Sequence, residues 1–245
     1  MLQSPFVDFI YRRSYLMFAM FKTVKFNLWR SLLALIILIF ADWGMMTSYP
    51  IFSGRLDWTF LPIGGALALI ILIGWNNTNT LFKKLNKRDW RWIAFILILG
   101  SLLSDIFILT GKLLNQTMAA NAGGDNWYEG LNVGGIILYL SQLSVSLIGE
   151  ELYIAAIFVL IFLLLSTFMR TKFSIWGAST ISLLVFGLSH YAVYDGNLYQ
   201  CIFVIGLAHA PSLYAWLKTQ NLLIPMLAHI LYDLILLFII LLFGI

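Results

Sequence analysis

Two consecutive glutamates and three histidines lie within apolar stretches of this 245-residue sequence. The glutamates are Glu150 and Glu151, and the histidines, which are all that the chain contains, are His190, His209 and His229. A carboxylate next to imidazoles can activate a water and stabilise a developing negative charge, which is the chemistry of hydrolysis. Ionisable groups inside apolar spans cost about 2.5 to 3.5 kcal/mol each on insertion scales, so each one is a candidate functional residue.

The spacing of these residues predicts how they face one another. Glu150 and Glu151 are about 100° apart on a helix, so one can face a substrate while the other makes a structural contact. His229 and Asp233 are four residues apart and therefore share one helical face. Asp233 could thus fix the ring orientation of His229, a supporting role that reacting or metal-bound imidazoles commonly need.

The composition predicts that lipid surrounds the protein. The chain is 61% hydrophobic and 11% charged, which is more apolar surface than a water-soluble core can bury. We therefore predict an all-α, polytopic transmembrane helical bundle. Apolar runs of about 20 residues, long enough to cross a bilayer, give seven predicted spans: 31–50, 58–75, 92–111, 131–168, 174–193, 198–217 and 222–244.

The basic residues predict the orientation of these spans. With a cytoplasmic N-terminus, thirteen Lys and Arg fall on the inner side and only Arg55 and Lys112 on the outer side. We expect residues 1–30, which are basic and aromatic, to form an interfacial segment on an anionic leaflet. Residues 31–245 then form a single transmembrane domain.

The run 131–168 would be about 57 Å long as one helix, which is too long for one upright span. A break at Gly149 would give eight crossings, but it would place Arg170, Lys172 and Lys218 outside, against the charge bias. We therefore favour one long or kinked helix.

Three short motifs in these spans resemble one family of membrane proteins. They are Gly149-Glu150-Glu151-Leu152-Tyr153, Phe186-Gly187-Leu188-Ser189-His190 and His229-Ile230-Leu231-Tyr232-Asp233. In this order on apolar helices they are similar to the motifs of the CPBP proteins (CAAX proteases and bacteriocin-processing or bacteriocin-immunity proteins, also called the ABI family), which include the type II CAAX prenyl endopeptidases. The resemblance covers about residues 135–240.

The resemblance implies an intramembrane endopeptidase acting on a membrane-embedded or lipid-anchored peptide or protein. It implies that Glu150 is the general base for a water, that His190 and His229 stabilise the oxyanion, and that Asp233 supports them in place of the commoner Asn. Glu151 belongs to the same expected site. The family's breadth in bacteria favours a bacterial plasma membrane. Because the basic residues follow membrane topology, we expect no nucleic-acid partner.

One departure from the family pattern favours an alternative. Many members have Arg five residues after the first Glu, where it would lie one turn from Glu151, but this chain has Ala155 there. Glu151 therefore needs another partner or a proton. The alternative function is a non-catalytic bacteriocin-immunity membrane protein of the same fold. His209 lies outside the family pattern, and we expect it to be structural or at most to line the cavity.

Two chemical alternatives stay open at this point. Glu150, His190 and His229 could instead bind a catalytic zinc ion, since one carboxylate with two histidines is a familiar zinc set, although no His-Glu-x-x-His motif is present. No other cofactor is expected. A proton-coupled transporter is a further class, with a relay of Glu150, Glu151, Asp105 and Asp233, but no inverted repeat supports it.

A single site also requires its residues to lie at one depth. Counted along the predicted spans, His229 is about 10 Å and His190 about 24 Å from the cytoplasmic edge. The two histidines meet only if the fifth span begins later than Ser174 or its helix protrudes into the cytoplasm.

Overall fold

The computed structural model describes residues 23–46, 56–119 and 130–243, and within these ranges the chain is helical without any strand. Residues 1–22 of the predicted interfacial segment lie outside the described part. The α-helices are α2 (Leu28–Met46), α3 (Phe60–Ile73), α4 (Trp75–Asn79), α5 (Trp90–Leu113), α6 (Val133–Leu165), α7 (Thr171–Ser189), α8 (Ala210–Thr219) and α9 (Leu223–Phe243). Three short helices, η1 (Asp57–Thr59), η2 (Gln200–Gly206) and η3 (Leu207–His209), connect them.

Among the described residues, six helical segments are long and apolar enough to cross a membrane. They are α2, α5, α6, α7, the composite segment Gln200–Thr219 and α9. A shorter apolar helix, Asp57–Ile73, lies where the sequence predicts another span. The chain is therefore an integral membrane protein, and the predicted polytopic helical bundle is confirmed.

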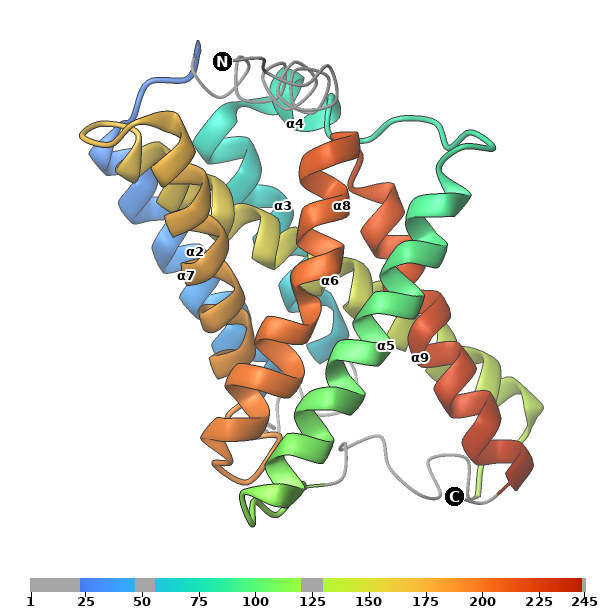
Figure 1. Ribbon diagram of the computed structural model, residues 1–245. Coiled ribbons are helices and arrows are strands. Elements are labelled where there is room, and N and C mark those ends of the chain that lie inside the picture. The colour runs from blue at the N-terminus through green and yellow to red at the C-terminus, as the bar shows by residue number, and fades with distance from the viewer. Residues whose placement is uncertain (1–22, 47–55, 120–129, 244–245) are drawn as a thin grey trace.

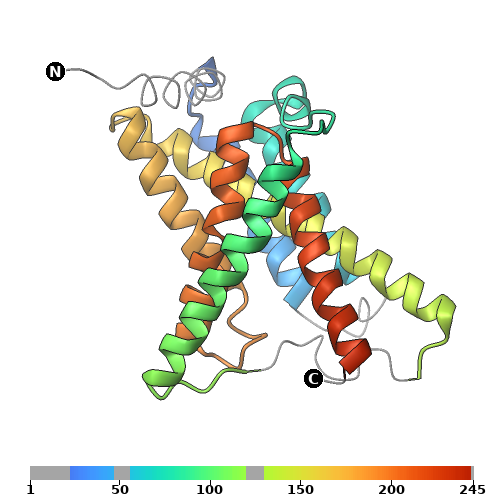
Figure 2. The ribbon, with the colours of Figure 1, turned by 45° about the vertical axis from the view of Figure 1, so that its right-hand side comes forward.

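The longest helix, α6, is continuous over 33 residues and passes through Gly149 without a break. The Asn132 side chain caps its start by accepting a hydrogen bond from the Gly135 backbone N–H. The alternative with eight crossings, which needed a break at Gly149, is wrong. Instead α6 runs obliquely through the bundle (Figures 1 and 2), and tilting is how a long helix fits a bilayer.

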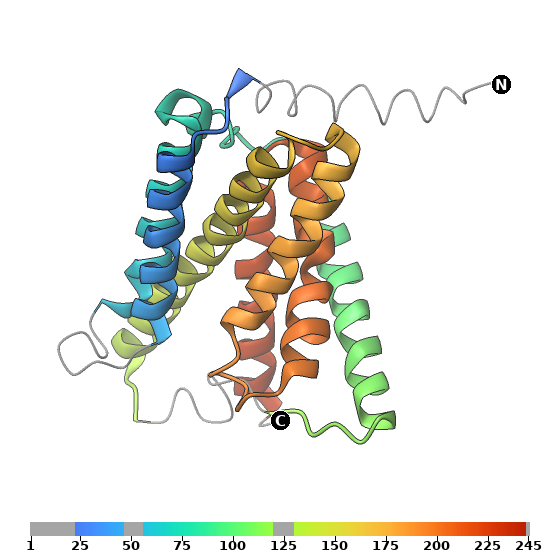
Figure 3. The same cartoon turned by 90° about the vertical axis from the view of Figure 1, so that its left-hand side faces the viewer.

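The second half of α6 is the centre of the protein. Nearly every residue between Ser146 and Leu163 is buried. Helices α2 and α3 cover one side of α6, and α5, α7, α8 and α9 lie on the other (Figure 3). This position explains why the sequence is uniformly apolar around the two glutamates: both faces of the helix contact protein rather than lipid.

Glycines bring neighbouring backbones close to the candidate site. Gly149 has no room for a β-carbon because Pro62 of α3 lies against it. Gly187 of α7 is likewise closed by the backbone of Cys201 in η2. The first contact fixes the rotation of α6 just before Glu150, and the second sets α7 against the segment that leads to His209.

The turn between α8 and α9 is attached to the segment before α5. The buried Asn221 side chain accepts a hydrogen bond from the Lys83 backbone N–H (3.0 Å) and donates one to the Lys83 carbonyl (2.9 Å). The Leu222 N–H donates to the Leu81 carbonyl at 2.8 Å. Because this turn joins α8 to α9, it fixes the end of α8 and the start of α9.

The basic residues of the described chain gather at one end of the bundle. The starts of α2, α5 and α7 and the end of α8, where most of them lie, are together at the top of Figure 1. Lys112 is at the opposite end, in the last turn of α5. This asymmetry is the one from which the sequence predicts a cytoplasmic N-terminus, and that orientation stays a prediction.

Candidate active site

Glu150 and Glu151 both lie in the buried half of α6 but face different surroundings. Glu150 is 8% exposed and borders a cavity, whereas Glu151 is 2% exposed and does not line that cavity. Their different directions follow from the helical rotation between consecutive residues. The predicted division, with one carboxylate facing a substrate space and the other making structural contacts, agrees with this geometry.

Glu151 is surrounded by polar side chains from η3, α8 and α9. Its Oε1 atom lies 2.9 Å from His209 Nε2 and 3.0 Å from His229 Nδ1. The Ser212 hydroxyl, one turn along α8, donates to the same oxygen over a longer distance of 3.5 Å. One carboxylate oxygen of α6 therefore contacts three side chains, one each from η3, α8 and α9.

Glu150 lies between two imidazoles. Its Oε2 atom is 3.9 Å from His190 Nε2 and 3.9 Å from His229 Nε2. These distances are longer than a direct hydrogen bond, and a gap of this kind suits a bridging water. His229 thus links the two carboxylates, because its Nδ1 contacts Glu151 and its Nε2 points toward Glu150.

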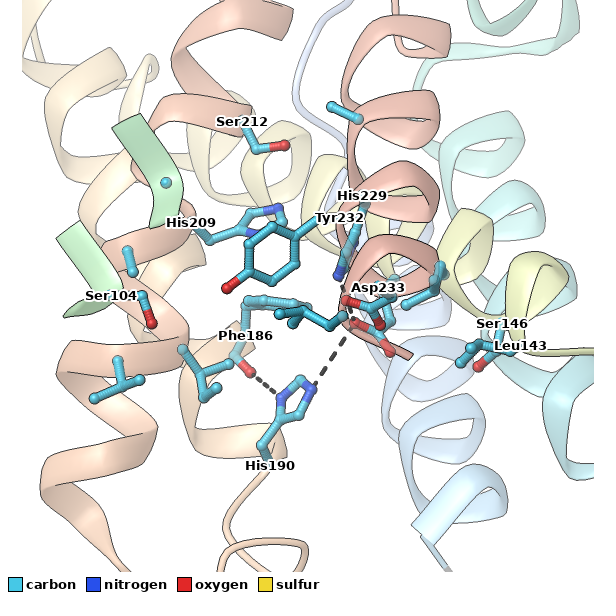
Figure 4. Close-up of a pocket in the computed structure, with 18 of the residues that line it drawn as sticks. Ser104, Leu143, Ser146, Phe186, His190, His209, Ser212, His229, Tyr232 and Asp233 are labelled. Atoms are coloured by element: carbon cyan, nitrogen blue, oxygen red, sulfur yellow. Dashed lines mark hydrogen bonds and ion pairs between the residues drawn. The ribbon is translucent and has the colours of Figure 1, made fainter. Parts of the chain in front are cut away.

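The end of α7 orients His190. The helix ends at Ser189, so the Phe186 carbonyl lacks a backbone partner; it accepts a hydrogen bond from the Ser189 hydroxyl at 2.7 Å and can accept another. His190 Nδ1 lies 2.9 Å from that carbonyl, which leaves Nε2 directed at Glu150 (Figure 4). The Phe-x-x-x-His spacing therefore has a physical reason: it places the imidazole within reach of a carbonyl at a helix end that has no backbone partner.

A cavity of about 600 Å³ adjoins these groups. Glu150, all three histidines and Asp233 line it, together with residues of α5, α6, α7 and α9. Figure 4 shows His190, His209 and His229 around a common space, with Tyr232 and Asp233 beside it. The volume is within the range of about 300 to 1,000 Å³ typical of ligand pockets.

Residues 132–235 match the family model described as type II CAAX prenyl endopeptidase Rce1-like. This match places the segment 132–235 in the CPBP family. No curated protein and no solved structure matches the chain. Members of the Rce1-like family are proteases, so the match supports proteolysis, without naming a substrate.

Within the CPBP segment, one expectation about an individual residue needs correction. The contact that orients His229 comes from Glu151, not from Asp233, which instead lines the cavity one turn along α9. α7 begins at Thr171, so the helix that carries His190 does not start later than Ser174. His190 and His229 nevertheless converge, because both reach the Oε2 atom of Glu150 on the oblique α6.

The set of residues compact enough to hold a metal ion also differs from the expected one. In the part of the chain that the structure describes, that set is Glu151, His209 and His229, whose ligand atoms lie within 4.8 Å of one another. The sequence had suggested Glu150, His190 and His229. A carboxylate with two imidazoles fits zinc by donor chemistry, so this group on the Glu151 side of α6 could hold a metal ion.

The sequence interpretation underestimated His209. It was expected to be structural or to line the cavity; it does line the cavity, but its Nε2 also lies against Glu151. The available signal was Ala155: without the family's arginine, Glu151 needed a partner from elsewhere, and His209 was the one histidine outside the motifs.

Proposed function

We propose that this CPBP-family chain is an intramembrane endopeptidase that hydrolyses a membrane-embedded or lipid-anchored peptide or protein. The observation that carries the proposal is the position of Glu150, whose Oε2 borders the cavity between two imidazole Nε2 atoms at 3.9 Å each. A water in that gap would contact a base and two stabilising groups at once, which is the arrangement that amide hydrolysis needs.

In the proposed reaction, Glu150 removes a proton from the water as its oxygen adds to the peptide carbonyl carbon. His190 and His229 stabilise the oxyanion from Nε2. Because each ring directs Nδ1 at a fixed acceptor, the Phe186 carbonyl or Glu151, it donates from Nε2 in its doubly protonated form. The C–N bond then breaks, the hydroxyl stays on carbon, and Glu150 returns the proton to the amine.

Asp233 supports this site from one turn along α9. It borders the cavity on the same face as His229, where a carboxylate can stabilise the doubly protonated imidazole through charge. The remaining cavity wall contributes apolar side chains such as Leu143, Leu236 and Ile240. A wall of this composition favours a substrate whose cleavage site carries apolar residues or a lipid.

A zinc-dependent reaction is the rival mechanism. Glu151, His209 and His229 would hold the ion, since these residues form the compact donor set. A bound zinc would act as a Lewis acid toward the substrate carbonyl or a water. In either mechanism Glu150, on the cavity side, remains the residue that moves the proton.

A non-catalytic immunity protein is the second candidate function, and Ala155 favours it. The residue is fully buried and places no charge beside Glu151, where many members have arginine. In this case the cluster would hold the helices together, and the cavity would bind a membrane-active peptide without cleaving it. We infer a bacterial plasma membrane with a cytoplasmic N-terminus for either function.

The deciding experiment measures peptide cleavage by the purified protein in detergent. Wild type and the variants Glu150→Ala, His190→Ala and His229→Ala are incubated with a quenched library of membrane peptides, with and without a zinc chelator. Asp105→Asn is the matched control, because Asp105 is an exposed carboxylate on α5 that does not line the cavity.

The proposal expects cleavage by wild type and Asp105→Asn, and loss of cleavage in the other three variants. Inhibition by the chelator would select the zinc mechanism, and resistance to the chelator would select glutamate chemistry. If folded wild-type protein cleaves nothing across the library, the immunity function replaces the peptidase.

A further inference from the structure

The partners of Glu151 distinguish this chain from the family pattern. Among the described residues, Glu151 makes ion-pair contacts with His209 and His229. His229 belongs to a family motif, but His209 does not. The position from which an arginine would reach Glu151 is Ala155, which is 0% exposed within the core cluster.

Two residue pairs with the same spacing lie on either side of the contact between Glu151 and His209. Glu151 and Phe158 are seven residues apart on α6, as are His209 and Trp216 at the start and middle of the α8 segment. Seven residues are about two helical turns, so each pair lies on one face. The Phe158 and Trp216 rings pack edge to face at 5.5 Å, two turns from the contact between Glu151 and His209.

The local structure before α8 holds His209 in place. The chain changes there from the π-helix η2 to the 3-10 helix η3, and His209 is the last residue of η3. The His209 ring lies between Phe186 (4.7 Å between centroids) and His229 (5.3 Å). A ring packed on two sides loses little further freedom when it contacts Glu151, which suits a positioning group.

We propose that His209 is a positioning residue for the hydrolysis, acting through Glu151 on His229. This inference rests on the proposed peptidase function. His209 Nε2 and His229 Nδ1 contact the same Oε1 atom of Glu151. His209 thereby holds the carboxylate in the orientation that directs His229 Nε2 at Glu150. His209, just before α8, thus contacts Glu151 in place of the arginine that Ala155 replaces on α6.

The principal test compares His209→Ala with the conservative His209→Gln, whose amide retains an N–H donor. His209→Ala should lower kcat about 10- to 100-fold, as loss of a supporting partner does at comparable sites, with little change in KM. His209→Gln should recover part of that loss. Tyr214→Ala is the control, because Tyr214 is exposed on the same helix and should leave kcat unchanged. All variants are first checked for folding by gel filtration and thermal melting.

Two results of this comparison would overturn the inference. One is an unchanged kcat in well-folded His209→Ala. The other is stoichiometric zinc in the purified wild type that is lost in His209→Ala together with activity, because His209 would then be a metal ligand.

A second measurement does not depend on cleavage. Melting temperatures of His209→Ala, Glu151→Gln and the double variant form a cycle. If His209 and Glu151 interact, the melting temperature of the double variant should be higher than the sum of the two single-variant shifts predicts. Additive shifts overturn the proposal whether or not the wild type cleaves peptide. Coupled shifts with no wild-type cleavage overturn the peptidase function and the catalytic role of His209 with it.

Discussion

The two faces of α6 at Glu150 and Glu151 differ in almost everything except sequence position. The Glu150 face borders the cavity and has its nearest imidazole nitrogens 3.9 Å away, whereas the Glu151 face is closed by α8 and α9 with contacts of 2.9 and 3.0 Å. Loose contacts beside a cavity leave room for a reacting water, and tight contacts in a closed environment fix geometry. Adjacent identical residues can therefore divide chemistry from support.

The largest expected effect separates chemistry from stability at Glu150. Glu150→Gln keeps the shape of the side chain but removes the base, so kcat should fall about 1,000-fold or more. The melting temperature should stay close to that of wild type, because the contacts of Glu150 with the two imidazoles are long, at 3.9 Å each. Steady-state cleavage and thermal melting of the same preparation check this. A large loss of stability with retained turnover would reverse the roles assigned to the two faces.

Glu151→Leu should lower both the stability of the protein and kcat. Removing the carboxylate leaves the imidazoles of His209 and His229 buried without their shared acceptor, which costs about 3 to 5 kcal/mol for a buried pair that loses one partner. We expect kcat to fall about 100-fold, as with other misplaced catalytic groups. Denaturant titration in mixed micelles measures the loss of stability. Wild-type stability in this variant would show that the closed face is not supporting the site.

Asn221→Ala tests support from outside the cluster. It removes the side-chain hydrogen bonds that attach the turn between α8 and α9 to Lys83, each worth about 0.5 to 1.5 kcal/mol. The turn holds the end of α8 and the start of α9, so its release should displace His209 and His229 slightly. We therefore expect kcat to fall about 10-fold, less than for a larger displacement. Asn221→Asp, which keeps the acceptor but not the donor, should lie between the alanine variant and wild type. Equal activity of all three would uncouple the turn from the site.

Ser212→Ala should have the smallest effect. The contact of its hydroxyl with Glu151 is long, at 3.5 Å, so we expect less than about 1 kcal/mol of stability and less than about threefold in kcat. Cleavage and melting assays run in parallel with the Glu151 variant check this. A loss as large as that of Glu151→Leu would mean that the serine, not the histidines, fixes the carboxylate.

The sequence predicted those features that depend on one helix at a time. Apolar runs and the basic residues between them predicted the helices, and the charge argument predicted that α6 is unbroken. The i,i+4 spacing predicted that His229 and Asp233 share a face, and both line the cavity.

The features that the sequence did not predict depend on how helices pack against one another. His209 and Glu151 are far apart along the chain, and their contact requires the change from π- to 3-10 helix before α8, which alters the direction in which His209 points. The identity of the carboxylate that contacts His229, which is Glu151 and not Asp233, also depends on interhelical packing. Spacing within α9 favoured the nearer carboxylate, whereas interhelical packing brought in the one on α6.

The order of the helices along the chain has a consequence for membrane insertion. α6 carries both glutamates, but His209 and His229 follow in segments that are synthesised later. During biosynthesis the two carboxyl groups must therefore enter the bilayer before their imidazole partners exist, at about 2.5 to 3.5 kcal/mol each. The apolar remainder of α6 and its close contact with the earlier α3 at Gly149 offset that cost. The nascent protein thus holds an incomplete site that no substrate can use until α9 has been inserted.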